Sequence, residues 1–156
     1  MTTLVVGLGH PDRGDDAVGL VAAGAMQAFG LPDTNVVTST TGLLGIIDDV
    51  AACERLVVID AIRSGAVPGT VVQFEARHLP TGLRSSFSSH AVGLAEEIAL
   101  LDNLGHLPTK VEVIGLELED VAIGTDLGPA VVKAMPTVIA AVIAFHAADR
   151  TGDVPG

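Results

Sequence analysis

Residues 4–16, LVVGLGHPDRGDD, join a short aliphatic run to a loop rich in glycine and aspartate. A continuous apolar run is typical of a central β-strand that is covered on both faces. A helical pattern follows and is closed by Gly30; its apolar positions are Val18, Val21, Ala22, Ala25 and Phe29. The stretch therefore predicts a strand, a loop and a helix.

The rest of the chain repeats this alternation. Further strands are predicted at residues 36–38, 56–59, 70–74 and 111–114, and further helices at residues 43–50, 92–101 and 129–148, with a kink at Pro136. We expect one α/β domain over residues 1–150, with three layers, a mostly parallel central sheet of about five strands, and helices on both faces. A Pro68-Gly69 turn indicates that one strand departs from strict alternation. Residues 151–156 are expected to be a frayed tail.

The composition limits the classes of molecule that the protein is expected to bind. Apolar residues form 49% of the chain and aromatic residues 3%, so the core must be aliphatic. The net charge of −11 disfavours nucleic acid and anionic membranes, and favours cations and basic partners. Cys53 is the single cysteine, the N-terminus does not resemble a signal peptide, and the apolar residues 138–148 are too few to span a bilayer. We expect a cytoplasmic monomer.

The loop after the first strand admits three interpretations. A dinucleotide-binding fingerprint fails, because Asp12 stands where the third glycine belongs. A phosphate-binding loop fails as well, because Asp15 and Asp16 replace its lysine and hydroxyl, and two carboxylates would repel a phosphate. The third interpretation is a loop that presents acids, in which one aspartate caps the helix and the other faces a cleft.

Asp60 and His90 are candidates for the same cleft. Asp60 follows the run 56–59, and the carboxyl ends of parallel strands meet at one edge of the sheet. A turn-forming aspartate is an equally weighted alternative. His90 opens a predicted helix, where a neutral imidazole can bind a metal, although a plain polar residue near a cap is the alternative. Two aspartates and one histidine would suit zinc or nickel.

Other hydrolase motifs are absent from the sequence. It contains no H-E-x-x-H, no G-x-S-x-G, and no Asp-Thr-Gly or Asp-Ser-Gly. Cys53 is expected to be a buried small hydrophobe, and His10 to be a turn residue or to line the cleft.

Three segments together resemble the hydrogenase maturation proteases, the endopeptidases that trim the large subunits of nickel–iron hydrogenases. They are residues 5–19 (VVGLGHPDRGDDAVG), residues 57–61 (VVIDA) and residues 89–94 (SHAVGL), with a weaker likeness at residues 115–131. The resemblance implies that the second acid of the loop, the strand-end aspartate and the histidine are metal ligands and catalytic residues. They correspond to Asp16, Asp60 and His90.

The resemblance also implies an activity. The enzyme would remove a short C-terminal extension from a hydrogenase large-subunit precursor, with the precursor's own nickel as recognition signal and no permanently bound cofactor. Either nickel or one aspartate could activate water. Two other hypotheses are a non-catalytic metal-dependent binding module or chaperone, and a nucleotide-binding flavodoxin-like domain.

This chain departs from the family pattern at three places. His10 replaces the usual asparagine, and Asp16 is one methylene shorter than the glutamate of many members. Residues 39–42, STTG, replace a common Asp-Gly-Gly turn. That turn contributes to substrate recognition in the family, so the identity of the partner stays open.

Overall fold

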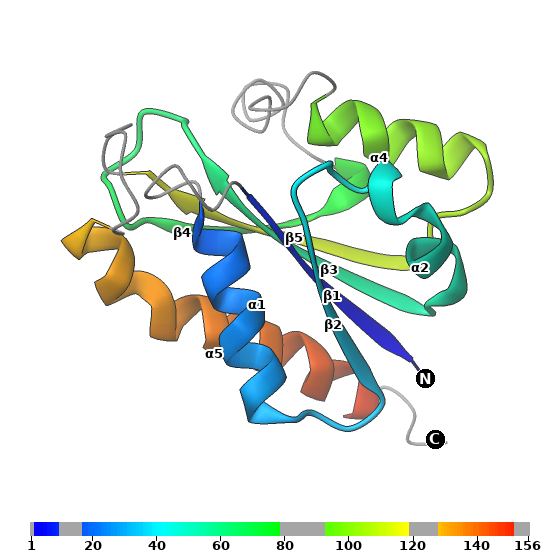
Figure 1. Ribbon diagram of the computed structural model, residues 1–156, viewed down its shortest axis with the longest axis horizontal. Helices are drawn as coiled ribbons and strands as arrows, with labels where there is room; N and C mark the ends of the chain where they lie inside the picture. The colour runs from blue at the N-terminus through cyan, green and yellow to red at the C-terminus, as the bar shows by residue number, and fades with distance from the viewer. Residues whose placement is uncertain (1, 10–16, 79–92, 119–127, 152–156) are drawn as a thin grey trace.

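The computed structural model describes residues 2–9, 17–78, 93–118 and 128–151 (Figure 1). Asp16 and His90 lie outside these residues. The elements in chain order are β1 (Thr3–Leu8), α1 (Val18–Phe29), β2 (Thr34–Ser39), η2 (Leu44–Ile46), α2 (Ile47–Ala52), β3 (Arg55–Ile62), β4 (Val71–Glu75), η3 (Ala76–His78), α4 (Leu94–Asn103), β5 (Lys110–Glu117) and α5 (Pro129–Thr151).

The sheet has the strand order β2-β1-β3-β5-β4. The pairs β1–β2, β1–β3 and β3–β5 are parallel, whereas β4 pairs antiparallel with β5. This confirms the predicted mostly parallel sheet, and β4 is the strand that departs from the alternation. In the sheet, β2 lies on one side of β1 and β3 lies on the other side. The strand order therefore reverses between β1 and β3.

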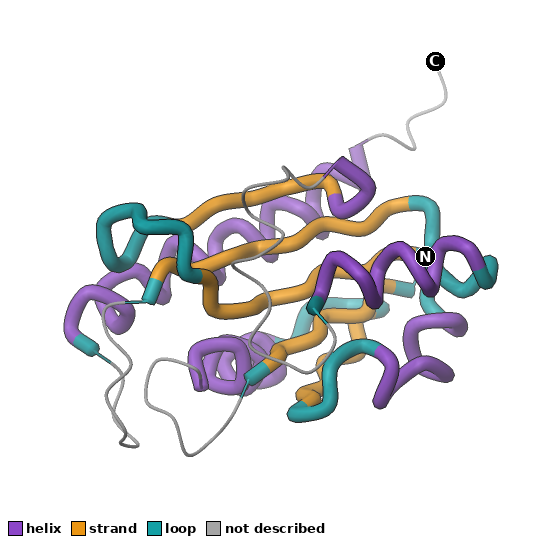
Figure 2. The backbone as a smooth tube through the Cα atoms, turned by 90° about the horizontal axis from the view of Figure 1, so that it is seen from above, coloured by secondary structure: helices purple, strands orange, loops and turns teal. Residues whose placement is uncertain are grey.

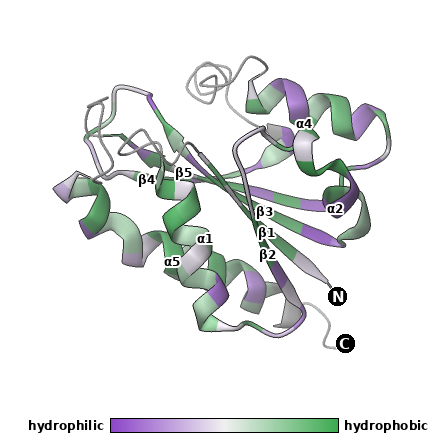
Figure 3. Cartoon of the chain, viewed as in Figure 1, coloured by the Kyte–Doolittle hydropathy of each residue, from purple (hydrophilic) through white to green (hydrophobic). Residues whose placement is uncertain are grey.

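Helices cover both faces of the sheet, as predicted (Figures 1 and 2). Each strand alternates between the two cores. On one face Val5, Val57 and Ile114 pack against α1 and α5. On the other face Leu56 and Val58 pack with side chains of α2 and α4, among them Val50, Leu94, Ile98 and Leu101. Figure 3 shows the corresponding hydrophobic colour on the sheet and on α1 and α5.

Helix α5 begins at Pro129 and continues through Pro136 to Thr151, three residues beyond its predicted end and into the predicted tail. Its segment Pro129–Ala148 is long and apolar enough to cross a membrane by length and composition, contrary to the expectation from residues 138–148. A core helix passes the same test, and α5 buries Val131, Val138, Ala141 and Val142 beside the sheet. We therefore interpret it as a core helix of this domain.

Candidate active site at the carboxyl edge of the sheet

Asp60 lies inside β3, which extends to Ile62 and not only to residue 59 as predicted. The side chain is only 1% exposed, and its Oδ1 accepts a hydrogen bond of 2.8 Å from the backbone N–H of Ala61. Because Asp60, Ala61 and Ile62 pair with β5, no turn exists here, and the interpretation of Asp60 as a turn-forming residue is wrong.

The environment of Asp60 is unusual for a carboxyl group. Its Cα partner on β5 is Gly115, and the preceding residue, Ile59, pairs with Gly7 of β1. It therefore lies beside the place where the strand order reverses, which is where open α/β sheets bind ligands. Alternation along β3 puts Asp60 on the same face as Val58 and Ile62, the face that α2 and α4 cover. A carboxylate is costly to bury, so its place at a ligand-binding edge points to a functional role.

Helix α1 starts directly against this edge. A Cβ on Gly19 would lie 2.1 Å from the carbonyl oxygen of Leu8 and 2.7 Å from that of Ile59, while a Cβ on Gly7 would lie 2.0 Å from the carbonyl oxygen of Gly19. Gly7 and Gly19, the first and last glycines of residues 5–19, therefore allow close helix–sheet packing. The N-cap residue of α1 is Ala17, without a side-chain capping bond, so neither predicted aspartate occupies that position.

A buried glutamate that the sequence analysis missed organises the segment after β2. Glu97 of α4 is 2% exposed, and its Oε2 accepts a hydrogen bond of 2.9 Å from the N–H of Leu44. Gly42 has φ +76°, and a Cβ there would lie 2.4 Å from Oε1 of Glu97. Within the same segment, Ser39 donates from Oγ to the carbonyl oxygen of Gly42 at 2.7 Å. Residues 39–44 are thus tied to the first turn of α4.

A second missed glutamate organises the loop after β3. Glu117, 3% exposed, is the last residue of β5, which extends three residues beyond its predicted end. Its Oε1 accepts hydrogen bonds from the N–H groups of Ser64 at 2.9 Å and Gly65 at 3.0 Å. Its Oε2 accepts a further bond of 2.8 Å from Oγ of Ser64.

Cys53 is not a candidate nucleophile. Burial raises the pKa of its thiol to about 11, with a smaller contribution of the same sign from Asp49 and an opposing backbone hydrogen bond. The thiol donates to the carbonyl oxygen of Val50 at 3.2 Å, and the side chain packs against the apolar core but is half-buried, so it is less buried than predicted. Because the thiolate is the reactive form, this thiol is inert near neutral pH.

The predicted metal set is divided between described and undescribed residues. Among residues 2–9, 17–78, 93–118 and 128–151, no three His, Cys, Asp or Glu side chains gather into a metal site. Asp16 and His90 lie outside these ranges, and so does His10. Asp60 is therefore the predicted site residue whose surroundings are described.

Comparison with known proteins gives the family. Residues 21–145 match the model of the hydrogenase maturation protease family. The hydrogenase 2 maturation protease of Escherichia coli is 29% identical over 134 residues, which cover 84% of this chain and 82% of that protein. The hydrogenase expression/formation protein HupD of Thiocapsa roseopersicina is 34% identical over 123 residues, 75% of this chain but only 56% of that protein's length.

Two solved structures are also similar to this chain. An endopeptidase from Escherichia coli, solved in solution, has a TM-score of 0.84 at 27% identity, with 99% of this chain and 95% of that chain covered. The hydrogenase maturating endopeptidase HybD from Escherichia coli has a TM-score of 0.79 at 23% identity, with 98% and 94% covered, which supports the fold. The chain therefore belongs to the hydrogenase maturation protease family, a family of endopeptidases, as the resemblance in its sequence predicts.

Proposed function

We propose that this protein removes a short C-terminal extension from a hydrogenase large-subunit precursor, and that nickel already held by the precursor is the recognition signal. The observation that carries the proposal is the buried Asp60 carboxylate beside the reversal of strand order. Family membership supports the reaction class and the kind of substrate. We place the reaction in the cytoplasm, with one monomer acting on one precursor.

The proposed ligand set is Asp16, Asp60 and His90. Asp16 is bonded to Ala17 at the start of α1, and Gly19 of that helix lies against the carbonyl of the residue before Asp60. His90 precedes the N-cap residue of α4, Gly93, and α4 covers the face on which Asp60 lies. Carboxylate oxygens and a neutral imidazole nitrogen are suitable ligands for nickel.

Hydrolysis needs an activated water and a proton for the leaving amine. When bound, nickel would polarise the scissile carbonyl or lower the pKa of water. Alternatively, an aspartate takes the proton from water and passes it to the amine. In either case the backbone N–H of Ala61 holds the Asp60 carboxylate in one orientation.

The test is incubation of the enzyme with nickel-loaded and nickel-free large-subunit precursor, followed by intact-mass spectrometry. Wild type, Asp16→Ala, Asp60→Asn and His90→Ala are compared. We expect loss of a C-terminal peptide only with wild type and nickel. Nickel-dependent association without scission would favour the binding module or chaperone. Stoichiometric zinc in the purified protein, unaffected by the three substitutions, would contradict the proposed ligand set.

A further inference from the structure

Strand β2 leaves one edge of the sheet open. Among the described residues β2 pairs only with β1. The N–H of Thr3 donates to the carbonyl of Asp33 at 2.9 Å, and that of Gly9 donates to the carbonyl of Ser39 at 3.3 Å. Because backbone groups alternate along a strand, residues 33, 35, 37 and 39 face β1, and Thr34, Val36 and Thr38 direct their N–H and C=O groups to the open edge.

This edge lacks the usual protection against pairing. The sequence of β2, TNVVTS, contains no proline and no charged residue, both of which commonly block edge strands. Val36 and Val37 are half-buried and point to opposite faces, so each face of the edge offers an apolar side chain.

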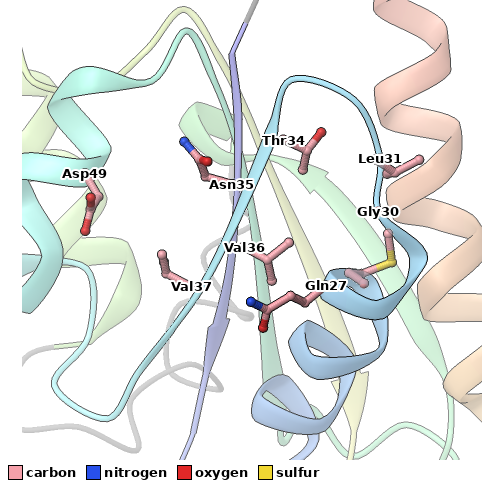
Figure 4. Close-up of a pocket in the computed structure, with 9 residues that line it drawn as sticks. Gln27, Gly30, Leu31, Thr34, Asn35, Val36, Val37 and Asp49 are labelled. Carbon is pink, nitrogen blue, oxygen red and sulfur yellow. The ribbon is translucent and has the colours of Figure 1, made fainter.

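A groove follows the same edge. Its volume is about 330 Å³, and its lining comes from the end of α1, the turn after it, β2 and α2: Met26, Gln27, Gly30, Leu31, Thr34, Asn35, Val36, Val37 and Asp49. In Figure 4, Val36 and Gln27 lie on one side of β2, while Val37, Asn35 and Asp49 lie on the other. The groove therefore extends over both faces of the open strand.

Asp49 is the one charged side chain among the described residues that line the groove. The neighbouring Asp48 and the nearby Asp33 are exposed. No lysine or arginine is among the lining residues in the part of the chain that the structure describes. An extended segment bound here would gain from positive charge and would be repelled if it were acidic.

We propose that the open edge of β2 binds an extended basic peptide segment by strand addition. Resting on the proposed function, the segment is the C-terminal extension of the precursor, which runs antiparallel to β2. The added strand would lie three strand spacings, about 14 Å, from β3. Four or five extended residues span that distance, so a peptide bound along β2 can keep its scissile bond near Asp60.

The direction of the strands supports this geometry. Ser39, at the carboxyl end of β2, is aligned with Leu8 of β1, and Gly7 is aligned with Ile59, the residue before Asp60. An extension that leaves the candidate active site therefore meets the carboxyl end of β2 first. Main-chain hydrogen bonds give such a complex its affinity, and side chains on alternate positions give it selectivity.

The first test measures binding of a fluorescent octapeptide of alternating lysine and valine to the whole protein by anisotropy. Asp49→Lys reverses the charge in the groove, and Glu96→Lys makes the same change at an exposed first-turn position of α4. Val36→Pro removes an outward N–H that the β1 ladder does not use. We expect Asp49→Lys and Val36→Pro each to weaken binding at least about tenfold, and Glu96→Lys to leave it within about twofold.

Two further probes separate strand addition from simple charge attraction. The same octapeptide N-methylated at alternate residues cannot complete the backbone ladder, so it should not bind. Amide hydrogen exchange should show that the unmodified peptide protects the N–H groups of Val36 and Thr38, while those of Asn35 and Val37 are protected already. Equal binding of the methylated peptide, or no new protection, would overturn the proposal. Protection at Val36 and Thr38 in the free protein, together with a dimer mass, would assign the edge to a second copy instead.

A failure of the proposed function gives a different result. Asp60→Asn should bind the octapeptide as wild type does, because Asp60 lies outside the groove. If the octapeptide binds but a precursor without its extension forms the same nickel-dependent complex, with the same affinity, the edge does not hold the extension. If the peptide binds and no precursor is cleaved, the strand-addition site stands and the proposed activity is wrong.

Discussion

Asp60 and Glu117 are buried carboxyl groups on neighbouring strands, yet their hydrogen bonds differ. Glu117 accepts bonds from Ser64 and Gly65, which lie 53 and 52 residues away in the sequence, so it fixes the course of a separate loop. Asp60 accepts a bond from the N–H of the next residue, Ala61, and it lies beside the place where the strand order reverses. Glu117 therefore holds a loop in place, whereas for Asp60 we propose a role in the chemistry.

The largest expected effect tests the proposed role of Asp60 in the chemistry. Asp60→Asn keeps an oxygen that can accept the bond from Ala61 but removes the negative charge. We expect the rate of extension release to fall about 10²–10⁴-fold, while the free energy of unfolding changes by less than about 1 kcal/mol. Intact-mass kinetics and urea unfolding measure the two quantities. A variant that keeps its rate and loses several kcal/mol would make Asp60 a structural residue like Glu117.

Glu117→Ala tests whether Glu117 holds the loop after β3 in place. The variant leaves the N–H groups of Ser64 and Gly65 without their acceptor, and we expect a loss of about 2–4 kcal/mol in the free energy of unfolding. Urea unfolding provides the measurement. Glu96→Ala is the control, because Glu96 is exposed and its removal should cost less than about 0.5 kcal/mol. Equal costs for both variants would show that Glu117 does not hold the loop.

The same two residues show what the sequence could reveal. Asp60 can be predicted as a site residue because an acid that directly follows four apolar residues is visible in the local sequence. The same apolar run predicts the strand that carries it. The end of that strand was placed too early, because Ala61 and Ile62 are strand residues only through pairing with Leu116 and Glu117 of β5. Pairing between distant segments leaves no periodic mark in either one.

Glu97 and Glu117 were missed for a related reason. The N–H groups that they accept from lie 52 or 53 residues away, and nothing near either glutamate in the sequence indicates such a partner. For Glu97 the sequence gives a general signal, because an acid beside the apolar stripe of α4 is expected to need a polar partner. The sequence does not identify that partner. Similarly, the Pro68-Gly69 turn predicts that a strand departs from the alternation. The position of that strand, β4, at the far side of β5 depends on long-range pairing.

A smaller effect is expected from the residue that pairs with Asp60. A Cβ on Gly115 would lie 2.9 Å from Cγ2 of Ile62 and 3.1 Å from Cγ2 of Val72, which are methyl groups attached directly to the Cβ atoms of β-branched side chains and have little freedom to move. Gly115→Ala should cost about 1–2 kcal/mol in unfolding free energy and lower the processing rate less than Asp60→Asn does. Gly24→Ala is the matched control, since nothing lies within 4 Å of a Cβ there and alanine favours the helix. A gain in stability from Gly115→Ala would show that the contact is loose.

The smallest effect concerns Glu112, a third carboxyl group, on the same strand as Glu117. Burial raises the pKa of Glu112 above its ordinary value, so folding favours the protonated form. Its contribution to stability is fully present below the unfolded-state pKa and is lost as the pH rises through the folded-state pKa. At pH 7 the ionised carboxylate therefore carries a penalty, which solvent keeps small because the group is only partly buried. Glu112→Gln should raise the midpoint of thermal unfolding slightly at pH 7, and the gain should shrink at pH 4, where much of the wild-type carboxyl is protonated. A gain that stays the same at both pH values would have to come from packing and not from the ionisation of Glu112.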